Sequence, residues 1–181
     1  MIIASFQQRI SAFLLDYLVI ALYMIFLVII SVGLGMGPFR DAFRTMFANP
    51  NISEISAFLL LVLPVILYFT LFESSSWKAS WGKRKLGLYV IDKHGERLTL
   101  PISFVRSILK FLPWELTHAC LWRIPGWPLA PTTPSPLIIA GLALVWILVA
   151  AYLVSILTNK KHRSLYDLIA GTSVIAFKHP K

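Results

Sequence analysis

Cysteine and charged residues are scarce in this sequence. The 181 residues include one cysteine, Cys120, which excludes an internal disulfide framework and a metal site built from several cysteines. Charged residues make up 14% of the chain and hydrophobic residues 57%. Soluble domains carry about 25% charged residues and roughly 45–50% hydrophobic residues. The composition therefore excludes an ordinary soluble fold. The length suits a single domain, residues 1–181, which we expect to lie in a membrane.

Acidic residues are the scarcer of the two charged classes. Eight Asp and Glu stand against 17 Lys and Arg, which gives a net charge of +9 at pH 7. An excess of basic residues can indicate nucleic acid binding, but in membrane proteins such residues gather in cytoplasmic loops and contact anionic headgroups. We therefore expect the lipid bilayer and its anionic lipids as partners, and no nucleic acid.

Motifs of catalytic and cofactor sites are missing as well. The sequence contains no G-x-S-x-G, no H-E-x-x-H and no phosphate-binding loop of the G-x-x-x-x-G-K-[ST] type. Glu115 and His118 form one E-x-x-H pair, whereas a di-iron bundle needs two such pairs and two further Glu. We expect this pair to be a satisfied polar face of a helix that points into a bundle. The sequence predicts no enzyme, no catalytic residue, no cofactor and no metal site.

Three long apolar segments are candidates for membrane spans. A bilayer core of ~30 Å needs ~20 apolar residues in a helix. Residues 137–157 and 55–72 contain no charged residue, and Pro64 should kink the second of them. Residues 10–33 are interrupted by one charge, Asp16. Because this apolar run exceeds the ~7–15 residues of a signal-peptide core, we expect a retained helix.

A fourth segment, residues 102–122, is less apolar, and the positive charges decide its role. Most Lys and Arg lie before the first span, in residues 73–101 or after the last span, while the other connections hold Arg40, Arg44 and Arg123. The positive-inside rule then predicts that both termini and residues 73–101 are cytoplasmic, in a plasma (bacterial inner) membrane. An even number of crossings requires residues 102–122 to span, with Arg106 and Lys110 reaching the cytoplasmic interface. Hydropathy alone leaves two alternatives open for this segment, a position on the membrane surface and a re-entrant loop.

The remaining segments favour small structures outside the membrane. Residues 86–100 combine two strand-like runs around the turn 93–96, which predicts a cytoplasmic β-hairpin, and residues 172–177 could add a third strand. Residues 164–171 predict a short interfacial helix that ends at Gly171. The proline-rich residues 123–136 predict an extended outer loop. The predicted fold is an all-α polytopic membrane protein with about four transmembrane helices, a cytoplasmic β-hairpin and a C-terminal interfacial helix.

Three regions together resemble the RDD family of membrane proteins, which is named for one arginine and two aspartates. Residues 8–16, QRISAFLLD, carry Arg9 and Asp16 at the start of the first span. Residues 80–92, SWGKRKLGLYVID, are similar to the family's G-K-R-x-x-G-L-x-V segment. Residues 164–172, SLYDLIAGT, are similar to its H-D-x-x-A-G-T pattern, with Tyr166 in place of the usual His. The resemblance implies a transport role, and for some members cation–proton antiport.

Arg9, Asp16 and Asp167 are therefore the candidate site residues. Arg9 and Asp16 are seven residues apart, so they lie on one helix face about 10 Å from each other along the axis. A carboxylate within the bilayer must be offset by a cation, a proton or water. Asp16 is accordingly either half of a structural salt bridge, with Arg9, Arg106 or Lys110 as partner, or a cation or proton site. For Asp167 we expect an ion pair with Arg9 or with residues 160–163.

Lys83, Arg84 and Lys85 lie just beyond the second span, which predicts a role in topological anchoring and in binding anionic lipid. Glu73, at the end of that span, is expected to form a surface ion pair with Lys78 or Lys83.

Two functions remain open at this point. The first is transport of a small cation, a proton or another small solute, for which the acid within the first span argues. The second is a non-transport scaffold or assembly factor, for which the compact cytoplasmic structure argues. Because four helices enclose a narrow path, transport would call for a homo-oligomer or a larger membrane complex.

Overall fold

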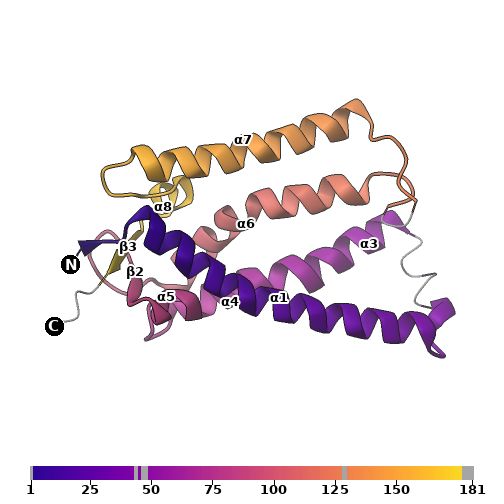
Figure 1. Ribbon diagram of the computed structural model, residues 1–181, viewed down its shortest axis with the longest axis horizontal. Coiled ribbons are helices and arrows are strands. Elements are labelled where there is room, and N and C mark those ends of the chain that lie inside the picture. The colour runs from indigo at the N-terminus through magenta and orange to yellow at the C-terminus, as the bar shows by residue number, and fades with distance from the viewer. Residues whose placement is uncertain (1, 43–44, 46–48, 128–129, 177–181) are drawn as a thin grey trace.

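The fold is an antiparallel bundle of four long helical segments with a small sheet at one end (Figure 1). A computed structural model describes residues 2–42, 45, 49–127 and 130–176. The segments are α1 (Phe6–Met36), the continuous run α3–η1–α4 (Pro50–Ser74), α6 (Leu100–Trp122) and α7 (Pro136–Thr158). Each contains one of the four predicted spans, so the predicted helical architecture is confirmed. Arg44, Lys178, Lys181 and residues 128–129 of the predicted outer loop lie outside the described residues.

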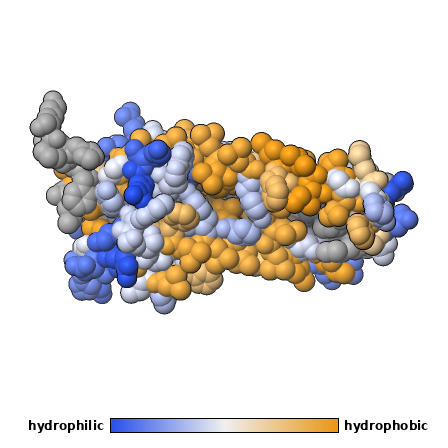
Figure 2. Space-filling model, turned by 90° about the horizontal axis from the view of Figure 1, so that it is seen from below, coloured by the Kyte–Doolittle hydropathy of each residue, from blue (hydrophilic) through white to orange (hydrophobic). Residues whose placement is uncertain are grey.

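Three of these segments, α1, Asn51–Ser74 and α7, are long and apolar enough to cross a membrane. The fourth, α6, is 23 residues long, as α7 is, but it carries Arg106, Lys110 and Glu115. It packs between α4 and α7, so its charged face is turned toward other helices rather than lipid. Figure 2 shows the result on one face of the molecule, where hydrophobic residues cover the middle and hydrophilic residues gather at the ends.

The second span changes its helical form just before Pro64. α3 (Pro50–Ala57) starts at the N-cap Asn49, a π-helical turn, η1 (Phe58–Val62), follows, and α4 (Leu63–Ser74) continues to the end. Proline has no N–H, so Pro64 cannot donate to the carbonyl of Leu60 four residues earlier. The hydroxyl of Tyr23 in α1 donates to that carbonyl at 2.7 Å. The predicted irregularity at Pro64 thus becomes a point of attachment between two spans.

The same arrangement recurs in α6 at Pro113. The carbonyl of Leu109 has lost the N–H that would normally come from residue 113, and the hydroxyl of Tyr152 in α7 donates to it at 2.5 Å. Backbone polar groups within a bilayer need a partner inside the protein. Each proline in the middle of a span is therefore matched by a tyrosine on a neighbouring helix.

Both termini and the short elements lie together at one end of the bundle, which we call the sheet end (Figure 1). It holds α5 (Trp81–Lys85), α8 (Leu165–Ile169) and a three-stranded antiparallel sheet in the order β1-β3-β2. β3 (Ser173–Ala176) is central, β1 (Ile2–Ile3) pairs with one edge and β2 (Leu88–Ile91) with the other. The third strand predicted at 172–177 is confirmed.

The hairpin predicted over residues 86–100 is wrong in its second half. The turn forms, with the Asp92 carboxylate accepting from the N–H groups of His94 and Glu96, but β2 pairs with β3 instead of with 97–100. Leu98 is buried in the apolar cluster under the sheet, and Thr99 is the N-cap of α6. Because α6 starts directly after the buried Leu98, residues 97–100 cannot form the second strand of a hairpin.

The predicted helix at 164–171 is confirmed as α8, and the chain leaves it at Gly171, whose φ is +66°. Such a positive φ favours glycine at the end of a helix.

Candidate functional site

Buried ionisable side chains gather where the bundle meets the sheet. Six such side chains, each less than 10% exposed, lie there. Three are basic and three are acidic: Arg9, Lys83, Arg106, Asp16, Glu73 and Asp167. α1 contributes through its single buried stripe of Arg9, Ala12, Asp16 and Ile20. A balanced set of charges is the condition under which buried ions are tolerated in a protein interior.

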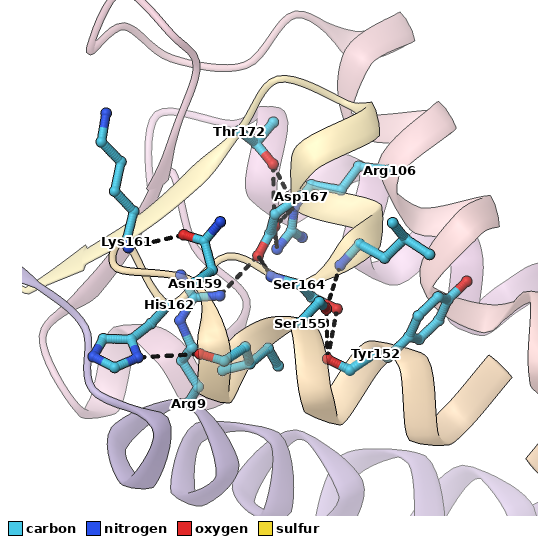
Figure 3. Close-up of polar contacts among 12 residues, drawn as sticks. Arg9, Arg106, Tyr152, Ser155, Asn159, Lys161, His162, Ser164, Asp167 and Thr172 are labelled. Carbon is cyan, nitrogen blue, oxygen red and sulfur yellow. Dashed lines mark hydrogen bonds and ion pairs between the residues drawn. The ribbon is translucent and has the colours of Figure 1, made fainter. Parts of the chain in front are cut away.

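Asp167 lies between two arginines from different helices (Figure 3). Its Oδ2 accepts from Arg9 Nη1 at 2.7 Å, and its Oδ1 accepts from Arg106 Nη2 at 2.8 Å and Nε at 2.9 Å. Burial alone would raise the pKa of this carboxyl, but the two guanidinium groups outweigh it and lower the pKa to about 2. The predicted pair of Asp167 with Arg9 is therefore confirmed, and Arg106 is a second partner that the sequence did not assign to it.

α8 holds the Asp167 carboxylate in place. Asp167 is the third residue of this helix and forms a capping box with the N-cap Ser164. Ser164 N–H donates to Oδ2 at 3.3 Å, and the Thr172 hydroxyl donates to Oδ1 at 3.1 Å. The short helix thus fixes the acid that joins α1 to α6.

Tyr166 occupies the position where the resembling pattern usually has His. Its ring lies 5.2 Å from the Arg106 guanidinium carbon and 5.4 Å from the Tyr152 ring. Burial and the neighbouring Asp167 charge raise the pKa of the phenol to about 12, so Tyr166 stays neutral near pH 7.

Glu73 joins Arg106 to the third cation, Lys83. Its Oε2 accepts from Arg106 Nη1, and its Oε1 accepts from Lys83 Nζ at 2.8 Å. The predicted pairing with Lys83 is confirmed, but the expected surface location is wrong because Glu73 is fully buried and Lys83 is 7% exposed. Lys83 therefore cannot serve the lipid-anchoring role predicted for it, since its ammonium points into the protein.

Asp16 has partners that were not predicted. Its Oδ1 accepts from Gly82 N–H at 2.7 Å and from the Tyr68 hydroxyl at 2.9 Å, and its Oδ2 accepts from the Ser80 hydroxyl at 2.6 Å. The expected salt bridge of Asp16 with Arg9, Arg106 or Lys110 is therefore wrong. Three donors surround the carboxylate, and the N-terminus of α5 supplies one of them.

Ser80 connects Asp16 to the ion pairs. Its hydroxyl donates to Asp16 and accepts from Lys83 Nζ at 3.2 Å. The three candidates Arg9, Asp16 and Asp167 thus belong to one continuous network, which runs through Arg106, Glu73, Lys83 and Ser80. The sequence indicated Glu73 and Arg106 as charged residues but did not predict that they pair with each other. The usable signal was a charged residue inside or directly after three of the four predicted spans: Asp16, Glu73 and Arg106.

A comparison with protein families matches residues 3–171, nearly the whole chain, to the RDD family. The chain belongs to the RDD family. Neither the curated proteins nor the solved structures gave a match. The resemblance seen in the sequence is confirmed, and the arginine and two aspartates that carried it in this RDD chain are the residues that the network brings together.

Two basic residues of the RDD segment 82–90 remain at the surface. Arg84 and Lys85 are exposed, and they lie over the exposed indoles of Trp77 at 4.0 Å and Trp81 at 5.6 Å. Tryptophan and basic residues together are typical of a membrane interface. Lipid anchoring by Arg84 and Lys85 stays a prediction.

The RDD bundle also forms a partly open cavity of about 620 Å³ between α1, α6 and α7. Its walls are mostly apolar. Four basic side chains line it, and the described lining residues include no Asp or Glu: the four are Arg9, Lys83, Arg106 and Lys110. Three of them belong to the ion network, so the cavity adjoins the network directly.

Lys110 is the exception among these cations. In the part of the chain that the structure describes, its amino group makes no hydrogen bond and no ion pair. Instead, Nζ lies 3.4 Å from the centre of the Phe69 ring, 5.1 Å from that of Phe111 and 5.3 Å from that of Phe13. Aromatic faces stabilise an ammonium group but do not neutralise it.

Glu115 and His118 do not form the satisfied polar face that was expected. Glu115 Oε2 and His118 Nδ1 are buried without a protein hydrogen-bond partner among the described residues, and that expectation is wrong. His118 packs edge-on against Trp114 and lines the cavity. Over the described residues, no three His, Cys, Asp or Glu side chains are grouped as a metal site would require.

Proposed function

We propose that this RDD protein is a solute transporter of the plasma (bacterial inner) membrane without enzymatic activity, and that the cavity between α1, α6 and α7 is its solute site. The observation that carries the proposal is a cavity of about 620 Å³ that reaches the ion network and is lined by an unpaired Lys110. This volume falls within the roughly 300–1,000 Å³ of small-molecule sites.

The network itself argues against a cation or proton as the solute. The Asp16 carboxylate accepts three hydrogen bonds, and Glu73 and Asp167 each bind two cations. A carboxylate with its acceptor positions occupied by fixed donors has little capacity for an additional cation. We therefore assign a structural role to the network and transport to the cavity beside it.

We propose that both termini and the sheet end face the cytoplasm. The support is the concentration of basic residues there, including the exposed Arg84 and Lys85, together with the positive-inside rule. Reporter fusions after residues 40, 90, 128 and 181 should read outside, inside, outside and inside. An inside signal at residue 128 would contradict the fourth crossing.

The second candidate is a scaffold or assembly factor. It is favoured by the compact sheet end, where three strands and two short helices build a surface that could receive another protein. A homo-oligomer or a membrane complex is compatible with either function.

Solute flux in proteoliposomes tests the proposal. Liposomes that contain the wild-type protein should take up a radiolabelled anionic solute faster than empty liposomes, and Val149→Trp, which fills the cavity wall, should abolish the difference. Ala143→Trp on the exposed side of α7 is the matched control and should retain flux. Equal uptake with and without protein, across cationic and anionic solutes, would favour the scaffold.

A further inference from the structure

We infer that the cavity binds a single-chain anionic amphiphile, such as a long-chain carboxylate, with the carboxylate on Lys110 and the chain along α6 and α7. This inference rests on the proposed function, since it names the class of solute.

Arg9 lies beside the cavity, but its guanidinium is used and buried by the protein. The residue is 8% exposed and lines the cavity, and Nη1 alone of its three nitrogens is bound, to Asp167. Nε and Nη2 are buried and have no hydrogen-bond partner among the described residues. Because these two nitrogens have no accessible surface, a ligand in the cavity cannot bind them, and the head group must be held by another cation.

Lys110 provides the cation for the head group. Its Nζ is 5.3 Å from the centre of the Phe13 ring, and Phe13 follows Arg9 by one helical turn on the same face of α1. An amino group inside a membrane protein without an ion partner is costly to keep charged. A bound anion would supply that partner.

The shape and walls of the cavity suit an alkyl chain. Its lining on α7 extends from Ile156 to Leu142, which is 15 residues or about 21 Å of helix. Between these limits the walls are formed mainly by Val, Leu, Phe and Trp side chains. An elongated apolar space that is lined by the unpaired Lys110 and, among the described residues, by no acid matches an anionic head and a single tail.

Equilibrium binding of tritiated palmitate to purified protein in non-ionic detergent tests the inference, with the matching fatty alcohol as competitor. Wild-type protein should bind palmitate saturably and the alcohol about tenfold or more weakly, because the alcohol lacks the charge that Lys110 recognises. Lys110→Gln should remove most of this preference. Lys85→Gln, an exposed cation outside the cavity, should bind palmitate as the wild type does.

Several results would overturn the inference: no saturable binding, equal affinity of wild-type protein for palmitate and the alcohol, or an unchanged preference in Lys110→Gln. Displacement of palmitate by phosphatidylglycerol at equal concentration would assign the site to a two-chain lipid and would also overturn it. The comparison of palmitate with the alcohol uses wild-type protein, so it decides the question even if a variant does not fold. Binding without palmitate flux would refute transport alone, while flux of another solute without palmitate binding would refute this inference alone.

Discussion

The carboxylate of Asp16 accepts a hydrogen bond from the backbone N–H of Gly82 at 2.7 Å, although 66 residues separate the two. Gly82 is in the first turn of α5, whose own N-cap residue, Ser80, makes no capping hydrogen bond with its side chain. An acid from α1 therefore caps a helix in another part of the chain. This contact explains why an aspartate is stable within the first span without a cation beside it.

The close approach at Gly82 predicts that no larger residue fits there. A Cβ at this position would lie 2.2 Å from the Ala12 carbonyl oxygen and 2.8 Å from the Asp16 backbone nitrogen. Gly82→Ala should therefore push α5 away from α1 and lower the free energy of unfolding by about 1–3 kcal/mol or more. Thermal unfolding in detergent measures this. Gly33→Ala, with nothing within 4 Å of the new Cβ, is the control, and equal stability of the two variants would contradict the packing argument.

Asp16 variants should separate hydrogen bonding from charge. Asp16→Asn keeps an oxygen that can accept from Gly82 and Tyr68, so it should be destabilised less than Asp16→Ala, which leaves three donors unpaired. The difference should be about 1–3 kcal/mol. Adding Arg9→Gln to Asp16→Asn should restore no stability, because Arg9 pairs with Asp167. Recovery of folded yield in the double variant would show that Arg9 and Asp16 are coupled after all.

The pH dependence of stability should report on Asp167. Its pKa in the folded protein is about 2, below the ordinary value of 3.8. The stabilisation is therefore fully present above about pH 4 and is lost as the pH falls from 3.8 toward 2, by on the order of 2 kcal/mol. Melting temperatures between pH 6 and pH 2 should fall less steeply for Asp167→Asn than for the wild type. Parallel curves would mean that Asp167 does not carry this acid sensitivity.

Neighbouring basic residues in α5 should behave differently. Lys83→Gln leaves the buried Glu73 with one cation fewer and should cost about 3–5 kcal/mol. Arg84→Gln with Lys85→Gln should leave the melting temperature unchanged and reduce the anionic lipid that copurifies with the protein, because both side chains are exposed. Lipid analysis by mass spectrometry and unfolding curves on the same preparations check this. A stable Lys83→Gln protein would remove Lys83 from the network.

The tyrosine opposite Pro113 offers a test by double substitution. Tyr152→Phe removes the donor to the Leu109 carbonyl and should cost about 1–3 kcal/mol. Pro113→Ala restores a backbone N–H four residues after Leu109, so adding it should recover part of the loss. A double variant less stable than the sum of the two single changes would refute compensation between these residues.

The spans could be predicted from the sequence because hydrophobic length is a local property, and the position of 102–122 followed from charge counting. The partners of the charged residues could not. Asp16 and Gly82 meet through packing of two distant segments, and no spacing along the chain encodes that. The pairing of Glu73 with Lys83 could be predicted because only ten residues separate them. The burial of this pair depended on α6, which brings Arg106 to the same place.

The hairpin error at 86–100 has a similar origin. The strand propensity of 88–91 was correct, yet strand partners are chosen by the whole fold, and β3 offered two edges while residues 97–100 were needed to start α6. β1 was missed because two isoleucines at the chain start give no periodic signal. The cavity was not foreseen at all, since it depends on the space left between three helices.

The central position of β3 sets an order of events during synthesis. β1 and β2 have no contact in the sheet until residues 173–176 arrive between them, and Asp167 must be made before Arg9 and Arg106 have their shared partner. Until residue 167 has been synthesised, Arg9 therefore has no ion-pair partner and Arg106 has only Glu73. We expect a nascent chain that stops before residue 164 to be recognised and degraded. Completion of the sheet end and release from the translocon would then be one quality-control step.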